Sequence, residues 1–257
     1  MRDARSIFDW SLSYVGDPLT WLERGEMVRE LLRSEGLRKE HRVLEIGCGN
    51  LSSGVPLIRY LDKGGYTGLE PNGWLVEAAI QDLKLGDLLR DKDPSFSWRG
   101  DFDVTAEYEV AGMFDFAVAH SVLSHAAAWQ LPQMLTNVRR ALRVGGKFLC
   151  SLRLGTRDTN ATEWVYPGNS FFTEATIGAQ ANQHGFDVTF RPEYRDRMVA
   201  VAPNDFHDWA LFERVKRTRT EYHVFSDEDL RVLGGLDEDT IQMLLAAQTG
   251  RQVEIED

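Results

Sequence analysis

Two acidic residues and a glycine-rich turn form the most chemically suggestive pattern in this 257-residue chain. The apolar run 43–46 carries Glu45 near its end and leads directly into a turn that contains Gly47 and Gly49. Glycines in such a turn can take positive φ and let a ligand approach the backbone. About 20 residues later a second apolar run ends in Glu70, placed to bind the two hydroxyls of a ribose. The pattern predicts a site for a cofactor with a ribose and a cationic group.

The turn does not fit the common phosphate-binding fingerprints. A dinucleotide fold places a third glycine where this chain has Ser52. A P-loop ends in Gly-Lys followed by Ser or Thr, and no Lys or Arg lies between Gly47 and Arg59. The turn therefore lacks the charge that would hold phosphates, while Glu45 and Glu70 surround it.

Five segments, taken in order, resemble the motifs of the class I S-adenosylmethionine (SAM) methyltransferases. The stretch around Glu45 is similar to motif I of that family, although many members have a third glycine where this chain has Leu51. The resemblance covers roughly residues 40–190. The later segments are 68–72, resembling the ribose-binding turn; 100–102, the adenine turn; 114–125, the fourth strand and its loop; and 142–149, the turn into the fifth strand.

The resemblance implies how SAM would be held. Glu45 would receive its ammonium group, directly or through water, and Glu70 would accept from both ribose hydroxyls. Asp101, or else Asp103, would take the adenine amino group, and the backbone amide of Phe102 would reach a ring nitrogen. The residues that the resemblance assigns to the cofactor are Glu45, Gly47, Cys48, Gly49, Glu70, Pro71, Asp101, Phe102, His120 and Ser121.

Two histidines are the candidates for a general base. Methyl transfer from a sulfonium is an in-line displacement, so the protein must align the nucleophile and remove a proton if that nucleophile is a hydroxyl. His120 and His125 lie in the loop that, by resemblance, reaches the transfer point, and imidazole titrates near neutral pH. His125 is similar to a histidine found at this place in many small-molecule members, so it is the first candidate and His120 the second. A structural hydrogen-bonding role is the alternative for both.

Aromatic residues are the candidates for the wall of an acceptor pocket, because such side chains line most small-molecule sites. Most of them lie in the long connection 155–172, whose aromatic content argues against disorder. Packing in the core is the alternative for these side chains. The candidates are Trp129, Trp164, Tyr166, Phe171 and Phe172.

The remaining histidines, His41, His184, His207 and His223, are expected at the surface or at strand edges. His207 and His223 together could be considered as metal ligands. No carboxylate or thiol spacing supports such a site, so we predict no metal.

Composition limits the classes of partner. The net charge of −11 argues against a general affinity for nucleic acid or anionic membranes. The N-terminal residues lead into no apolar segment typical of a secretory signal, and no run approaches the roughly 18 apolar residues of a membrane span. Cys48 and Cys150 do not make a disulfide framework. We therefore expect a cytoplasmic protein.

Strand-like and helix-like patterns alternate along the chain, which predicts a doubly wound α/β sheet. The resemblance adds an antiparallel seventh strand to an otherwise parallel sheet. Expected strands lie near 42–46, 66–69, 96–99, 114–119, 147–152, 186–190 and 209–214, and expected helices near 53–63, 73–83, 130–142 and 173–184, besides an opening helix that follows Asp17-Pro18 and ends at Gly36.

We expect one methyltransferase domain over residues 1–257. Its expected parts are an N-terminal helical cap (1–40), a SAM-binding half (41–152), an acceptor-side half (153–225) and a C-terminal helical extension (226–257). A helical pair within 226–248 would pack on the body or contact a second copy, so a homodimer through the terminal segments is an open alternative.

The sequence thus predicts a SAM-dependent methyltransferase that acts on a small molecule, with a hydroxyl acceptor favoured because a histidine base is at hand. A protein methyltransferase is an alternative, since the acidic surface could attract basic peptides. A nucleic-acid methyltransferase is disfavoured because Ala119-His120-Ser121-Val122 stands where such enzymes carry Asn/Asp-Pro-Pro-aromatic or Pro-Cys signatures. A SAM-binding sensor or partner subunit without transfer activity is the third alternative.

Overall fold

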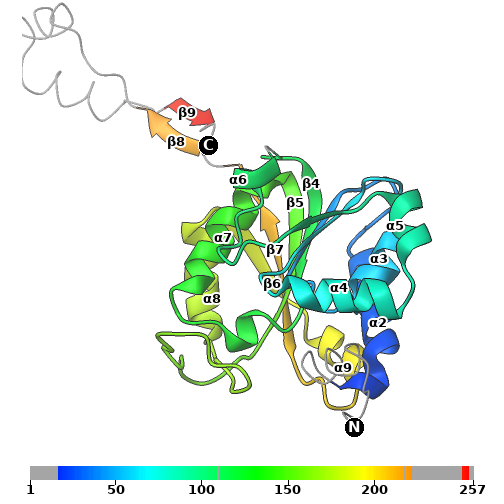
Figure 1. Cartoon of the computed structure of the whole chain (residues 1–257). Helices are drawn as coiled ribbons and strands as arrows, with labels where there is room; N and C mark the ends of the chain where they lie inside the picture. The colour runs from blue at the N-terminus through cyan, green and yellow to red at the C-terminus, as the bar shows by residue number, and fades with distance from the viewer. Residues whose placement is uncertain (1–16, 109, 217, 222–250, 255–257) are drawn as a thin grey trace, which may run out of the picture. The chain divides into compact units, whose positions relative to one another are not determined.

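The computed structural model describes residues 17–108, 110–216, 218–221 and 251–254. The chain divides into two units, Met1–Val215 and Lys216–Asp257. The first unit holds a seven-stranded sheet in the order β3-β2-β1-β4-β5-β7-β6 (Figure 1). Neighbouring strands pair in parallel except β7, which is antiparallel to both β5 and β6. The predicted doubly wound, mostly parallel sheet with an antiparallel seventh strand is therefore confirmed.

The central strands are buried along their whole length, because helices cover both faces of the sheet. β1 lies between β2 and β4, so that Glu45 sits beside Gly68 on one side and Val118 on the other. The strand bounds are β1 Val43–Ile46, β2 Tyr66–Leu69, β3 Ser95–Ser97, β4 Phe114–Ala119, β5 Leu142–Leu152, β6 Phe186–Phe190 and β7 Asp208–Arg214.

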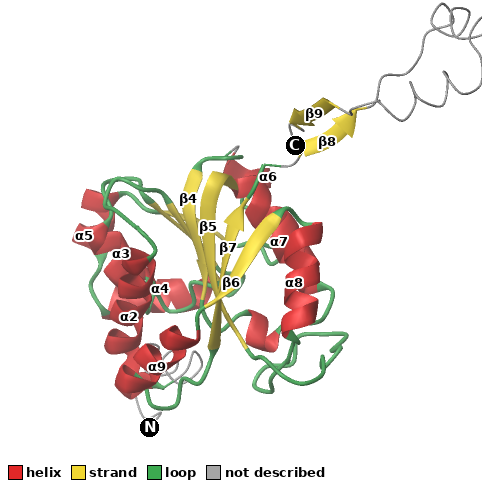
Figure 2. Ribbon diagram, turned by 180° about the vertical axis from the view of Figure 1, so that it is seen from behind, coloured by secondary structure: helices red, strands yellow, loops and turns green. Residues whose placement is uncertain are grey.

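Helices α2, α3, α4, α5 and α9 lie on one side of the sheet, and α6, α7 and α8 lie on the other (Figure 2). Their bounds are α2 Trp21–Ser34, α3 Gly54–Tyr60, α4 Gly73–Asp82, α5 Gly86–Lys92, α6 Thr105–Tyr108, α7 Gln130–Ala141, α8 Glu174–Gln183 and α9 Pro192–Val201, with short 3-10 turns η1 Pro18–Thr20 and η2 Leu123–His125.

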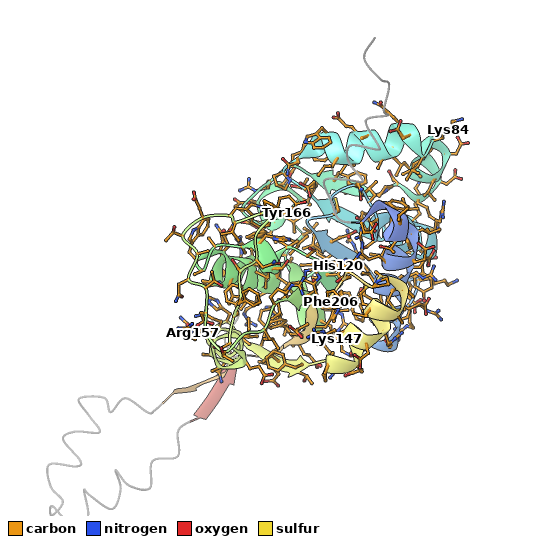
Figure 3. All side chains as sticks on the ribbon, turned by 90° about the horizontal axis from the view of Figure 1, so that it is seen from below. Lys84, His120, Lys147, Arg157, Tyr166 and Phe206 are labelled. Atoms are coloured by element: carbon orange, nitrogen blue, oxygen red, sulfur yellow. The ribbon has the colours of Figure 1, made fainter. Side chains whose placement is uncertain are left out.

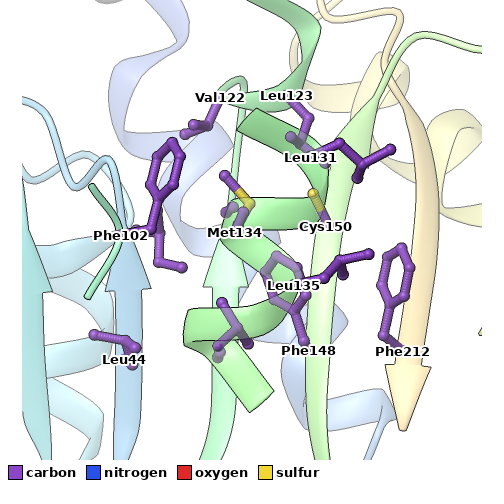
Figure 4. Packing of buried hydrophobic residues seen from close by; sticks show 14 of the residues in the cluster. Leu44, Phe102, Val122, Leu123, Leu131, Met134, Leu135, Phe148, Cys150 and Phe212 are labelled. Carbon is purple, nitrogen blue, oxygen red and sulfur yellow. The ribbon is translucent and has the colours of Figure 1, made fainter. Parts of the chain in front are cut away.

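The larger apolar core lies between the sheet and the α7–α8 side. Met134 and Leu135 of α7 face Phe148 and Cys150 of β5, and all four side chains are fully buried (Figure 4). Met134 and Leu135 belong to the apolar stripe of α7, and a surface helix that packs on a sheet requires such a stripe. This packing fixes α7, and with it the loop after β4.

The opening helix α2 packs directly on the glycine turn. Asp17 caps the short turn η1, which directly precedes α2, by accepting from the Leu19 amide at 2.9 Å. Gly36, at φ +101, follows the end of α2. A Cβ added at Gly25 would lie 1.9 Å from the carbonyl oxygen of Ser52, so glycine permits this close approach. The predicted N-terminal helix is confirmed from residue 21, and it lies against the turn after β1.

The antiparallel direction of β7 has a consequence for the site. Asp208, the first residue of β7, pairs with Leu152, the last residue of β5. The segment before β7 therefore reaches the edge at which the parallel strands end. Helix α9 precedes this segment and leads the chain to the same edge. Pro192 lies in its first turn, and Tyr194 and Met198 are buried.

Some elements differ from the expectation. Strand β5 begins at Leu142 rather than near residue 147, because Leu142 pairs with Phe114 before an irregularity in the ladder. Helices α5, α6 and α9 were not expected; α5 has no fully buried residue, so its apolar periodicity is weak. Within the described ranges, no helix combines the length and apolar character needed to cross a bilayer.

The terminal segments are only partly described. The predicted helical pair at 226–248 and residues 1–16 lie outside the described residues, so the expected dimer contacts do too. Of the extension 226–257, residues Arg251–Glu254 form strand β9 rather than helix, and β9 pairs antiparallel with β8 (Thr218–Glu221).

Candidate active site

A cavity of about 690 Å³ opens at the carboxyl edge of the parallel strands. Its wall includes Glu45 and Glu70 from the ends of β1 and β2, and His120 and His125 from the loop after β4. Figure 3 looks along this direction and shows His120 near the centre of the view, between Tyr166 and Phe206. One cavity therefore contains both the predicted cofactor acids and the predicted histidines.

Eight of the predicted cofactor residues line this cavity, and two do not. The lining residues are Glu45, Gly47, Cys48, Glu70, Pro71, Phe102, His120 and Ser121. Gly49 takes part through its backbone instead, because its amide donates to Glu70 Oε2 at 3.0 Å. Gly47, at φ +68, has no room for a larger side chain, since an added Cβ would lie 2.5 Å from Val122 Cγ2.

Glu70 is a buried carboxylate that organises the backbone around it. Oε2 accepts from Gly49, and Oε1 accepts from the backbone amide of Asn72 at 2.8 Å and from its side chain at 3.1 Å. The carboxylate thus links the turn after β1 to the end of β2. It has remaining lone pairs for the hydroxyls of a ribose.

Glu45 is fully buried, and burial raises its pKa to about 8, with the nearby charge of Glu70 acting in the same direction. The Tyr66 hydroxyl donates to Glu45 Oε2 at 2.6 Å and opposes this rise. A buried carboxyl group whose ionisation is this costly is stabilised when a cation arrives beside it. The geometry therefore suits the ammonium group of SAM.

Three residues without glycine's freedom hold positive φ around the site: Leu51 at +62, Phe102 at +64 and Ser121 at +59. Each lies in a loop beyond the carboxyl end of a strand. Such conformations cost on the order of 1–3 kcal/mol and persist where the surrounding structure enforces them, often at functional sites. Leu51, where many members of the family carry glycine, adopts the same backbone conformation that glycine would favour.

The segment 100–102, predicted as the adenine turn, borders the cavity, but its acid is engaged elsewhere. Gly100 and Phe102 line the cavity, whereas Asp101 accepts from Arg99 Nε at 2.9 Å and does not line it. The alternative residue, Asp103, accepts from the amide of Thr105 at 3.0 Å and pairs with Arg140 at 2.9 Å. Arg99 itself lines the cavity, and sequence reasoning did not identify it.

His125 is held in a single orientation. Its Nδ1 lies 2.7 Å from the carbonyl oxygen of Gly168, which can only accept, so Nδ1 carries the proton. Nε2 is then an acceptor and faces the Ser121 hydroxyl at 3.4 Å. Burial lowers the pKa of His125, and the charge of Arg153 lowers it further, so the ring is neutral near pH 7. A neutral imidazole with an available Nε2 can act as a base.

His120 belongs to a buried network that the sequence did not reveal. Its Nε2 lies 2.9 Å from Asp205 Oδ2, while Asp205 Oδ1 lies 2.6 Å from His207 Nδ1. His207 Nε2 contacts the Ser124 hydroxyl at 3.1 Å. Burial works to raise the pKa of Asp205, but the two imidazole rings hold it well below its usual range.

The expectation of a surface or strand-edge position for His207 was wrong, since His207 is 7% exposed and lines the cavity. His120, Asp205 and His207 are residue types that can bind metals, and their ligand atoms lie within 4.8 Å of one another. Each oxygen of Asp205 is engaged by a different ring, which is the geometry of a hydrogen-bonded network. One sequence signal for this network is that two polar residues, Asp205 and His207, stand just before the predicted antiparallel strand.

The predicted aromatic wall is divided by the structure. Trp164 and Tyr166 line the cavity, and their rings lie 5.9 Å and 4.9 Å from the ring of His125. Phe172 instead belongs to the main core, where it is 4% exposed. Phe171 and Trp129 are largely exposed and do not line the cavity. An apolar residue in this connection thus faces either the core, the solvent or the site.

Two further arginines line the cavity. Arg24 of α2 is buried beside the turn after β1; burial lowers its pKa, while the charges of Asp205 and Asp17 oppose that shift. Arg153 follows the last residue of β5 and donates from Nη1 to the Phe206 carbonyl oxygen at 2.7 Å. Sequence reasoning identified neither residue, because both lie outside the recognised motifs.

Residues 44–148 match a family model described as a methyltransferase domain. No curated protein sequence matches the chain. Magnesium protoporphyrin IX methyltransferase from Synechocystis PCC 6803, solved with bound SAM, has a similar structure, with a TM-score of 0.57 at 16% identity over 81% of this chain and 91% of that chain. The carbon methyltransferase of CurJ has a TM-score of 0.54 at 16% identity over 74% of this chain and 54% of that chain, so the match spans about half of its length.

The [4+2]-cyclase SpnF is also similar, with a TM-score of 0.53 at 15% identity over 74% of this chain and 80% of that chain. Identities this low establish the shared fold, and a cyclase among the neighbours shows that the fold alone does not specify the reaction. The matched domain, the strand order and the antiparallel β7 agree with one another. Residues 44–148 thus resemble a methyltransferase domain, and the chain has the class I methyltransferase fold.

Proposed function

We propose that this protein transfers the methyl group of SAM to a hydroxyl of a small molecule, with His125 as the general base. The observation that carries the proposal is that one cavity is lined both by Glu45 and Glu70, from the ends of β1 and β2, and by His120 and His125, from the loop after β4. The first pair suits a cationic ribose-bearing cofactor, and the second pair suits removal of a proton from an acceptor.

Three groups of this chain support the cofactor assignment. The raised pKa of Glu45 favours an incoming ammonium group, and Glu70 keeps lone pairs for the ribose. Arg24, a buried arginine that lines the same cavity, would bind the methionine carboxylate. SAM, when bound, supplies a methyl group on a sulfonium that is already activated for displacement.

The chain's task is then to position the acceptor and take its proton. A hydroxyl hydrogen-bonded to His125 Nε2 would lose its proton to that atom as its oxygen bonds to the methyl carbon. The other proton stays on Nδ1, which donates to the Gly168 carbonyl oxygen and so keeps Nε2 free to accept. Trp164 and Tyr166 pack around the ring and limit the access of water.

An acceptor of small size fits the enclosure better than a polymer does. The connection 155–172 contributes Trp164 and Tyr166 to the wall, so this segment covers the acceptor end. The net charge of −11 gives no general attraction for a nucleic acid. Cys48 and Cys150 are both buried free thiols, which suits a reducing cytoplasm.

The test has two stages. Calorimetric titration with SAM and with its demethylated product, S-adenosylhomocysteine (SAH), should show micromolar binding; no binding to either would overturn the proposal. Transfer of a labelled methyl group to a panel of phenols, alcohols and amines should then favour hydroxyl acceptors.

His125→Gln should lower turnover by about 10²–10⁴-fold while SAH affinity is unchanged. With His125 as the base, activity should rise with pH through its lowered pKa and stay constant above it. His120→Gln provides the comparison: a larger loss in that variant would assign the base to His120.

A further inference from the structure

We propose that the acceptor carries an oxyanion, a carboxylate or a phosphate, and that Arg153 binds this group beside the hydroxyl to be methylated. The proposal rests on the methyl-transfer function above, because it names the class of acceptor for the same cavity. Arg153 follows β5 at the carboxyl edge of the sheet, where β4 and β5 end side by side with Ala119 opposite Cys150. This position lies on the acceptor side, away from the acids at the ends of β1 and β2.

The hydrogen-bonding capacity of Arg153 is largely unused. A guanidinium has five N–H donors, and Arg153 gives one of them to the Phe206 carbonyl. Its Nε is buried and has no acceptor, and among the described residues no carboxylate forms an ion pair with this side chain. A buried donor without a partner is costly, so an acceptor group from a ligand would be stabilised here.

The carboxylates of the cavity are engaged by other groups. Both oxygens of Asp205 are held by the rings of His120 and His207. Arg99, the other arginine near the site with an exposed head, is paired with Asp101. Arg153 therefore brings a positive charge to the acceptor end that the described part of the chain does not neutralise.

Arg153 is also close enough to the proposed base to act on the same molecule. Its charge lowers the pKa of both His125 and His207, so the guanidinium lies within electrostatic reach of both rings. A ligand oxyanion on Arg153 would place a neighbouring hydroxyl near His125 Nε2. The paired oxyanion is held by charge, and the hydroxyl oxygen gains the methyl group while its proton passes to Nε2 and SAH leaves.

The experiment compares hydroxy acids with their amides on the SAH-loaded protein. Probes are glycolate and glycolamide, salicylate and salicylamide, and 4-hydroxybenzoate and 4-hydroxybenzamide, with inorganic phosphate as the second oxyanion. We expect at least one acid, or phosphate, to bind roughly tenfold or more tightly than the neutral probes. Acids alone would assign a carboxylate, and phosphate alone a phosphate.

Arg153→Gln should abolish this preference and leave SAH affinity within about twofold, while Arg153→Lys should keep part of it because the charge remains. Arg157→Gln is the matched control, since Arg157 is exposed on the same connection, and Figure 3 labels it at the periphery of the body, away from His120. That variant should behave like the wild-type chain.

Several results would overturn the inference. These are equal binding of acids and amides, no binding of any oxyanion, or a preference that persists in Arg153→Gln. A large loss of SAH affinity in Arg153→Gln would show that this residue holds the cofactor's carboxylate instead. Failure of the wild-type chain to bind SAH at all would count against the methyl-transfer function, so the two proposals fail in different ways.

Discussion

The backbone amide of Gly49 donates a hydrogen bond of 3.0 Å to Oε2 of Glu70, which joins the turn after β1 to the end of β2. One side chain therefore shapes the backbone on which a cofactor would rest and also offers it lone pairs. Because the carboxylate serves both purposes, its removal affects the site more than a single lost contact would.

Glu70→Gln should lower SAH affinity about tenfold to hundredfold, because a hydrogen bond to a charged group contributes roughly 1.5–3 kcal/mol. Calorimetric titration measures this change. Glu77→Gln, on the exposed face of α4, is the matched control and should leave affinity unchanged. An unaltered affinity in Glu70→Gln would contradict the ribose assignment.

Cofactor affinity should depend on pH through Glu45. In the free protein its pKa is raised to about 8, and an ammonium group beside it would lower that pKa, so binding releases a proton below pH 8. Affinity should therefore rise with pH towards 8, by at most tenfold per pH unit. Titrations at pH 7 in buffers of different ionisation enthalpy count the released protons.

Glu45→Gln is the control for this pH dependence, because an amide does not titrate. The variant should release no proton from this position and should bind SAM more weakly. Equal proton release in both proteins would assign the effect to another group.

Gly25→Ala should destabilise the protein and weaken SAH binding, because the new Cβ would lie 1.9 Å from the Ser52 carbonyl oxygen and push α2 away from the turn. Gly178→Ala in α8 is the matched control, with no atom within 4 Å of the added carbon. It should stabilise the helix by about 0.5–1 kcal/mol. Thermal unfolding should show a lower melting temperature for Gly25→Ala and a higher one for Gly178→Ala. Equal shifts in melting temperature would show that the contact between α2 and the turn is unimportant.

At position 51, glycine should give a more stable protein than alanine, which is the reverse of the usual order. Leu51 is fully buried at φ +62, so either replacement loses packing worth about 2–5 kcal/mol. Alanine keeps the unfavourable backbone conformation and glycine relieves it, so Leu51→Gly should be the more stable variant by up to about 1 kcal/mol. Denaturant unfolding measures the difference; a more stable Leu51→Ala would show that the backbone has relaxed.

The sequence predicted the fold, and it predicted that Glu45 and Glu70 lie in one cavity, because both depend on local patterns. Glu45 and Glu70 stand at the ends of apolar runs, and their positions follow directly from a parallel sheet. The network of His120, Asp205 and His207 could not be read in this way, since residues 85 positions apart meet only after β7 turns antiparallel. The sequence predicts an antiparallel β7, but it does not show that the residues before β7 lie at the edge where the parallel strands end.

Side-chain direction in loops was the other missing information. Trp164 and Phe172 have similar chemistry and lie in one connection, yet one lines the cavity and the other packs in the core. The apolar character of a residue predicts that its side chain is buried, but it does not predict whether that side chain packs in the core or lines a cavity. Arg153 was missed for the opposite reason, because a single arginine after a strand has no distinguishing pattern until its neighbours are known.

The antiparallel β7 divides the cavity between two stretches of chain. The turns after β1, β2 and β3 supply one part of the lining, whereas Arg153, the connection that follows it and the approach to β7 supply another. In the proposed function the first part holds the cofactor and the second part holds the acceptor. For an engineer, residues 153–207 are the natural segment to graft when a new acceptor is wanted on the same methyl donor.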